Sequence, residues 1–170
     1  TITGFYTILV DGDDMDEPIS DAVRGILDGH IVLSRKLAQK YHYPAVDVLA
    51  SISRLANRVS GAVTKKASGY MRLLMAVYEE SEDMINVGAY QKGTNPSIDE
   101  AIDRHDSIEK FLCQEVADPA PISDTLKKMG EVVKMEIPPE ETGVHGPGAR
   151  QKFAPAAEAA EKYDQSEWQE

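Results

Sequence analysis

The sequence predicts an α/β fold with a parallel sheet in its first third, followed by an α-helical part. Up to residue 60, apolar β-branched segments alternate with short amphipathic ones, which is the rhythm typical of a parallel α/β sheet. After Gly61 the apolar residues recur every three or four positions, as expected for helices. From Lys134 onward prolines and glycines become frequent and large apolar residues become rare.

Strands and short helices are expected in turn along the first part. The segment 3–10 contains Phe5 and Tyr6 among aliphatic residues, which predicts a mostly buried strand. An amphipathic helix is expected over 19–27, since Gly29 stands just beyond its end. The remaining expected elements are a strand over 30–34, a helix over 35–41 and a strand over 46–53.

The second part predicts helices separated by turns. A first helix is expected from about residue 63 to Tyr78, and a second over 81–91. Ser97 and Glu100 have the spacing of a capping box, which predicts the start of a long helix. A shorter helix is expected over about 122–133.

The last 37 residues favour disorder. They contain four prolines and three glycines, and their only large aliphatic or Phe residues are Ile137, Val144 and Phe153, which cannot close a core. The predicted domains are therefore 1–60 (α/β), 61–133 (helical) and 134–170 (disordered tail).

Composition limits the class of partner. Eighteen basic residues against 29 acidic ones give a net charge of −11, which argues against nucleic acid or an anionic membrane as the main partner. No apolar run approaches the roughly 18 residues that a membrane-spanning helix needs, and we expect no leader of charged and then apolar residues. We expect a cytoplasmic protein that meets membranes only through partners. The strand-like start at Thr1, without a methionine, suggests a piece of a longer protein.

The residues that could bind a metal do not form a metal motif. The acidic segment DGDDMDEP (11–18) has Asp16 and Ala22 where a calcium loop needs glycine and glutamate, so a solvated loop that faces a basic partner is preferred. The four histidines lie far apart, and we expect them to be structural or exposed. Cys113 is the only cysteine and is expected to be a buried thiol on a helix face. No metal site is predicted.

The segment HYPAVDVLASISR (42–54) poses a question, because a predicted strand ends on a charged residue. An arginine at the end of a central strand is costly unless its guanidinium meets an anion. A salt bridge at the rim of the sheet would explain Arg54 without any function, and Tyr43 could simply belong to the core.

Several long motifs, in order and at matching spacing, resemble one family over residues 1 to about 133. They are GFYTILVDGDDMDEPISDAVRGILDGHIVLSRKLA, HYPAVDVLASISR and VGAYQKGTNPSIDEAIDRHDSIEKFL. They look like the C-terminal part of the flagellar protein export ATPases, which belong with the type III secretion ATPases and are relatives of rotary ATP synthase subunits. The resemblance implies the C-terminal part of a P-loop (RecA-like) parallel-sheet core, followed by an α-helical C-terminal domain.

The resemblance also implies roles for single residues. In this family the subunits form a homo-hexamer that binds ATP and Mg²⁺ at its interfaces. The tyrosine of the YPA motif, here Tyr43, stacks on adenine, and Pro44 fixes the backbone that presents it. The arginine of the SISR motif, here Arg54, reaches the γ-phosphate in the neighbouring subunit as a trans arginine finger.

Partners are implied in the same way. The acidic loop of rotary relatives faces a central stalk, so Asp13, Asp14 and Asp16 would contact a coiled-coil stalk protein. The helical domain would face the membrane export gate and receive chaperone-bound substrates.

The resemblance leaves two alternatives open. The Walker A and Walker B residues are absent from these 170 residues, so the chain alone is not expected to hydrolyse ATP. The first alternative is an injectisome secretion ATPase, which shares these motifs. The second is a non-catalytic interaction module that lacks the P-loop and acts only by binding partners.

Overall fold

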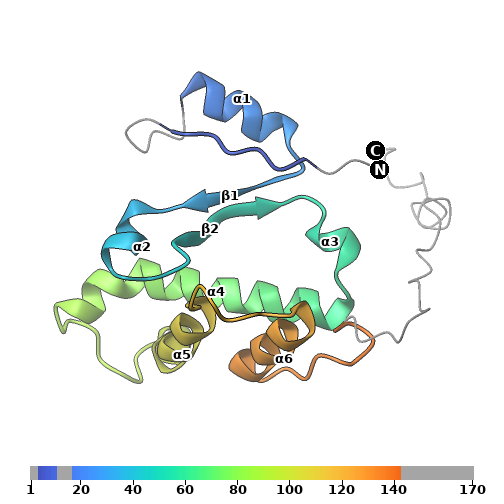
Figure 1. Ribbon diagram of the computed structural model, residues 1–170. Coiled ribbons are helices and arrows are strands. Elements are labelled where there is room, and N and C mark those ends of the chain that lie inside the picture. Colours follow the sequence, from blue (N-terminus) through green and yellow to red (C-terminus); the bar gives the residue numbers. More distant parts are fainter. Residues whose placement is uncertain (1–3, 11–16, 143–170) are drawn as a thin grey trace, which may run out of the picture.

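A computed structural model of the chain describes residues 4–10 and 17–142. The two strands lie between helix α1 on one side and the long helix α4 on the other, with α5 and α6 packed against α4 (Figure 1). In chain order the elements are α1 (Pro18–Ile26), β1 (Gly29–Leu33), α2 (Arg35–Gln39), β2 (Val46–Ser53), α3 (Ala56–Val59), α4 (Ala62–Asn86), α5 (Pro96–Leu112) and α6 (Ile122–Val133).

The two described strands form an antiparallel pair. Gly29 pairs with Ser53 and Leu33 with Val46, with an irregularity between His30 and Val32. The fold class, an α/β part followed by a helical part, holds, but the parallel pairing expected of these two segments is wrong. The connection, residues 34–45, contains the five-residue α2 and a loop, and the Ser34 N–H donates to the Ala45 carbonyl. This hydrogen bond joins the first and last residues of the connection, so the end of β1 lies beside the start of β2, as in an antiparallel pair.

Residues 4–10 do not form the expected buried strand. Phe5 and Leu9 are each 95% exposed, and the segment carries no strand assignment. A strand needs a neighbour for its backbone N–H and C=O groups. Among the described residues β1 and β2 pair only with each other, so this apolar segment has no strand beside it.

Helix α4 is a single helix of 25 residues. The break expected near residue 80 is absent, because the stretch EESEDM contains no glycine or proline to interrupt the helix. The helix ends before Gly88, whose φ of 71° is a conformation that glycine adopts easily. The expected capping box at Ser97 is also wrong: Asn95 is the N-cap of α5, and its side chain accepts from the Ser97 N–H.

The core lies in the helical part and includes residues beyond α6. Its buried apolar residues are Ala67, Met71, Leu74, Ala101, Ile108, Met129, Val133 and Ile137. Ile137 is 7% exposed and Thr142 is buried, so residues 134–142 pack against the helices and differ from the tail expected there. The rest of that predicted tail, 143–170, lies outside the described residues.

Within the part of the chain that the structure describes, no helix combines the length and apolarity required to cross a membrane.

Candidate nucleotide-interface site

Tyr43 lies in the loop between α2 and β2. Its side chain is 49% exposed, so it is not the core residue of the simpler interpretation. The Tyr43–Pro44 peptide bond is cis. The exposed ring of Tyr41 meets the Tyr43 ring edge-on, with centroids 5.6 Å apart and an interplanar angle of 88°. Tyr43 therefore combines an accessible ring with an aromatic neighbour that limits the ring's orientation.

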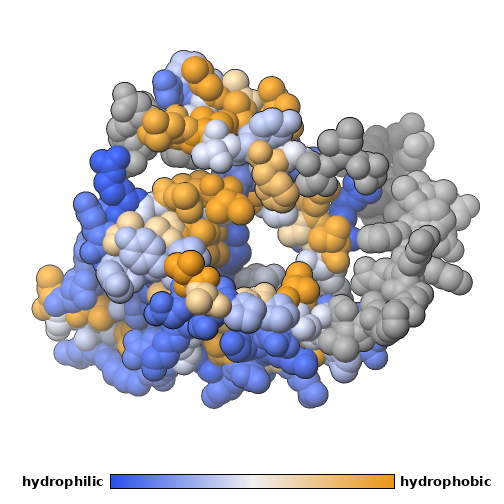
Figure 2. Space-filling view, viewed as in Figure 1, coloured by the Kyte–Doolittle hydropathy of each residue, from blue (hydrophilic) through white to orange (hydrophobic). Residues whose placement is uncertain are grey.

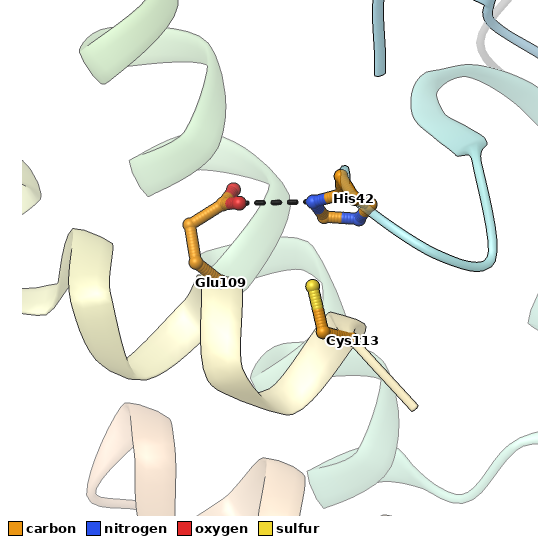
Figure 3. Close-up of side chains that lie close together, drawn as sticks. All are labelled: His42, Glu109 and Cys113. Carbon is orange, nitrogen blue, oxygen red and sulfur yellow. Dashed lines mark hydrogen bonds and ion pairs between the residues drawn. The ribbon is translucent and has the colours of Figure 1, made fainter. Parts of the chain in front are cut away.

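The loop that carries Tyr43 is tied to the helical part. The side chain of His42, 6% exposed, points toward α5, and its Nδ1 lies 2.9 Å from Glu109 Oε2 (Figure 3). The Gln114 N–H, just beyond α5, donates to the Tyr43 carbonyl at 2.9 Å. Because these contacts hold the residues before and at Tyr43, the position of its ring depends on α5.

Arg54 follows directly after β2. Its backbone N–H donates to the Asp28 carbonyl at 2.8 Å, which fixes the chain at the strand end. Its exposed guanidinium donates from one nitrogen to the Arg24 carbonyl of α1 at 3.3 Å. The Arg54 guanidinium has no carboxylate partner among the described residues, so these residues do not form the salt bridge considered at the rim of the sheet. Most of its donors remain available for an anion.

Tyr43 and Arg54 stand at opposite ends of β2. The strand has eight residues, so at about 3.3 Å per residue about 25 Å of extended backbone lies between the two residues. The structure thus keeps the two candidate residues apart.

The other residues singled out in the sequence have local explanations or lie outside the described part. His30 Nε2 lies 3.2 Å from the Ala50 carbonyl, and His105 stacks on Tyr78 with centroids 3.6 Å apart. Cys113 is exposed, which corrects the expected buried thiol: it caps the C-terminus of α5, where the helix face no longer covers it. Asp13, Asp14, Asp16 and His145 lie outside the described residues.

Sequence reasoning missed two contributors to the site. Tyr41 adopts a φ of 63°, which turns the chain and brings its ring beside Tyr43. Glu109 holds His42 across 67 positions of sequence. A local sequence pattern does not indicate a pair of residues so far apart in the chain. The spacing of Glu109 and Cys113, four residues apart near the end of a predicted helix, does indicate that these two lie on the same helix face.

Comparisons with known protein families cover both parts of the chain. Residues 62–131 match the T3SS EscN ATPase C-terminal domain. Residues 1–53 match the nucleotide-binding domain of the ATP synthase alpha/beta family. The chain belongs to the flagellar and type III secretion ATPase family.

Named members of this family are similar over most of the chain. The flagellum-specific ATP synthase of Treponema pallidum is 52% identical over 85% of this chain and 32% of its own length. That of Bacillus subtilis is 52% identical over 74% of this chain and 29% of its own length. The type 3 secretion system ATPase of Pseudomonas savastanoi pv. phaseolicola is 46% identical over 74% of this chain and 28% of its own length. The chain thus spans about a third of the length of these flagellar and type III secretion ATPases.

Solved structures of the family share the fold. The assembled ATPase EscN of the enteropathogenic E. coli type III secretion system is 38% identical, with a TM-score of 0.73 over 75% of this chain and 31% of that chain. EscN in complex with its central stalk EscO has a TM-score of 0.65 at 38% identity, over 68% of this chain and 29% of that chain. The likeness extends over the α/β part and the helical part predicted from the sequence.

Proposed function

We propose that this chain contributes to a ring of subunits that hydrolyses ATP to drive protein export, with Tyr43 at one nucleotide site and Arg54 at the adjoining one. The observation that carries the proposal is the placement of both exposed side chains at opposite ends of β2. In this proposal, residues at the two ends of a strand about 25 Å long reach two different nucleotides. In a closed ring of identical subunits, each site would then receive Tyr43 from one subunit and Arg54 from its neighbour.

Arg54 acts on the γ-phosphate in this proposal. Its guanidinium has a single carbonyl partner among the described residues and keeps donors for a phosphate. Placed against the γ-phosphate, it neutralises negative charge that develops as the phosphoryl group is transferred, an effect typically worth about 10³ to 10⁵ in rate. The hydrogen bond from its backbone N–H to Asp28 fixes the base of the side chain.

Tyr43 holds the adenine base in this proposal. Its half-exposed ring offers a face for stacking, and Tyr41 packs against it edge-on. Pro44 limits the backbone freedom of the loop that presents the ring. The residues present fit the base and the γ-phosphate of ATP, while ligands for the remaining phosphates and for Mg²⁺ must come from Walker A and Walker B residues, which these 170 residues do not contain.

The proposed partners are based on solved structures of a relative and on the family resemblance. We propose a homo-hexamer in the cytoplasm with a central stalk, because EscN is solved both as an assembled ATPase and with its stalk EscO. Asp13, Asp14 and Asp16 are proposed to contact the stalk, and the helical part to face the export gate and chaperone-bound substrates. Flagellar export is proposed ahead of injectisome secretion, because two flagellum-specific relatives are 52% identical and the secretion relatives 44–49%, although the flagellum-specific relative from Salmonella typhimurium is 43% identical.

A chimera tests the role of Arg54. This chain replaces the aligned part of the Bacillus subtilis flagellum-specific ATP synthase, to which it is 52% identical, and ATP turnover is measured. We expect Arg54→Ala to lower kcat by about 10³ or more, and Arg54→Lys to recover little, because an ammonium lacks the planar fork. Arg58→Ala, at an exposed arginine in α3, is the matched control and should leave turnover unchanged.

Mixing two inactive variants tests whether Arg54 acts across the interface. One chimera carries Arg54→Ala, and the other lacks the phosphate-loop lysine of the Bacillus part. In a mixed ring, the Arg54→Ala subunit keeps its phosphate loop and receives Arg54 from its neighbour, so turnover should partly return. A mixture as inactive as its two components, or an Arg54→Ala chimera as active as the Arg58→Ala control, contradicts the proposal.

A further inference from the structure

Three potential metal-ligand side chains meet between the Tyr43 loop and the end of α5. They are His42, Glu109 and Cys113 (Figure 3). The nitrogen, oxygen and sulfur atoms that they offer all lie within 4.8 Å of one another. The hydrogen bond between His42 and Glu109 makes no use of the thiol that lies beside it. We propose that these three residues bind a zinc ion.

The backbone holds the three ligands close to their required positions. Glu109 and Cys113 are four residues apart at the end of α5, and residues at this spacing share a helix face. His42 comes from the loop, which the hydrogen bond from the Gln114 N–H to the Tyr43 carbonyl fixes beside α5. A site assembled from a helix end and an anchored loop loses little conformational freedom when an ion binds.

The ligand atoms, all within 4.8 Å of one another, suit zinc after side-chain movements of up to about 1 Å, which bring the sulfur about 3.6 Å from the nitrogen and oxygen. Zinc bonds to histidine nitrogen and carboxylate oxygen at about 2.0–2.2 Å, so two such ligands in a tetrahedral site lie about 3.3 Å apart. His42 Nδ1 and Glu109 Oε2 are 2.9 Å apart, and a rotation that opens this pair by about half an ångström makes room for the ion. The ion then takes the place of the proton that the two atoms share.

The types of ligand select the class of metal. A thiolate and an imidazole beside one carboxylate favour zinc and similar transition metals, whereas magnesium and calcium require oxygen ligands. His42 is buried, Glu109 partly buried and Cys113 exposed. The ion therefore has a path of entry from the side of Cys113, where water can occupy its fourth position.

A bound zinc ion would connect the α/β part of the chain to the helical part. Zinc would bridge the residue before Tyr43 to α5 through metal bonds in place of one hydrogen bond. The proposal uses no nucleotide role of Tyr43 or Arg54, so its test is independent of the proposed function.

Cobalt is the first probe, because its complexes with thiolates absorb light. The metal-free 170-residue chain is titrated with Co²⁺ and then with Zn²⁺. We expect one equivalent to produce thiolate-to-cobalt absorption, which zinc then abolishes by displacement. Cys113→Ser should remove this absorption. Glu109→Gln should weaken binding at least about tenfold, since losing even a group that only supports a ligand costs that much.

Because Cys113 is the only cysteine in the chain, a thiol reagent supplies a second measurement. Zinc should slow the modification of Cys113 in the original chain but not in Glu109→Gln or His42→Asn, with circular dichroism used to confirm that each variant is folded. Glu115→Gln is the matched control, since this nearby carboxylate is exposed and outside the cluster. It should retain both the cobalt absorption and the protection.

Two results would overturn the proposal. One is a titration without thiolate-to-cobalt absorption and without protection of Cys113. The other is metal binding of unchanged affinity in Cys113→Ser, which would place the ion elsewhere in the chain, for example on the carboxylates of segment 11–17.

Discussion

Arg54 and Tyr43 keep their functional groups exposed, although hydrogen bonds fix the backbone of both residues. The N–H of Arg54 bonds to Asp28, and the carbonyl of Tyr43 accepts from Gln114. A fixed backbone lowers the entropy lost when a side chain meets a ligand. Each of the two residues should therefore lose little backbone entropy when its side chain binds a ligand.

Tyr43 should contribute to nucleotide affinity and not to the chemical step. In the Bacillus chimera, Tyr43→Ala should raise KM for ATP by about fivefold to about 150-fold with kcat little changed, because stacking of a base on an aromatic ring is worth about 1–3 kcal/mol. Tyr43→Phe retains the ring and should behave like the unmodified chimera. Steady-state kinetics measure both variants, and an unchanged KM in Tyr43→Ala would exclude stacking.

At the level of elements, α4 depends on a cap from outside its own sequence. Its N-cap is Gly61, which has no side chain to offer. Instead Glu141 accepts from the Val63 N–H at 3.1 Å and from the Thr64 N–H at 2.7 Å. A Cβ at position 61 would overlap the Glu141 side chain. Glycine at this position thus makes room for the distant carboxylate that satisfies the helix end.

The cap should make stability depend on pH. Burial favours a higher pKa for Glu141, but the N–H donors at the start of α4 outweigh it and lower the pKa below its ordinary value of 4.5. Because the folded pKa is lowered, the contribution is present above pH 4.5 and is lost as pH falls through the folded pKa. Glu141→Gln should cost about 1 kcal/mol near neutral pH and progressively less in acid.

Urea unfolding across this pH range measures the difference between the original chain and Glu141→Gln. Glu140→Gln serves as the control, since this neighbouring carboxylate is exposed and no α4 N–H is seen to donate to it. A Glu141→Gln difference that stays constant as pH falls would contradict the charged cap.

At the level of the whole molecule, the α/β part and the helical part differ in how they cover apolar surface. The helices bury a shared core, whereas hydrophobic side chains collect on the exposed surface of the α/β part (Figure 2). The exposed residues there include Phe5, Leu9, Ile26, Ile31 and Leu33. An apolar surface of this kind is typical of an interface, in agreement with a chain that spans about a third of the length of its relatives.

The helical core should require the residues that follow α6. Ending the chain after Val133 removes buried Ile137 and the Glu141 cap, and should lower the free energy of unfolding by about 3 kcal/mol. Ending it after Thr142 keeps both and should leave stability unchanged. Thermal unfolding compares the two truncations with the full chain, and equal stability of the two would show that residues 134–142 do not support the helices.

The sequence predicted the succession of elements, because hydrophobic period and turn residues are local signals. It placed β2 over 46–53 and the last helix over 122–133, and both agree with the structure. It misplaced the cap of α5, since Asn95 and Ser97 compete for the same role and only backbone geometry decides between them. It also divided α4, because a run of charged residues hides the apolar stripe that continues through it.

By itself the sequence determined the α/β and helical parts, the family, and Tyr43 and Arg54 as the candidate residues, because each depends on residues close together in the chain. The tertiary structure alone decided the antiparallel pairing of β1 with β2, the cap that Glu141 provides to α4, and the meeting of His42, Glu109 and Cys113. These features join residues far apart in the chain. Their pairing depends on how the elements pack in three dimensions, which no local pattern of residues encodes.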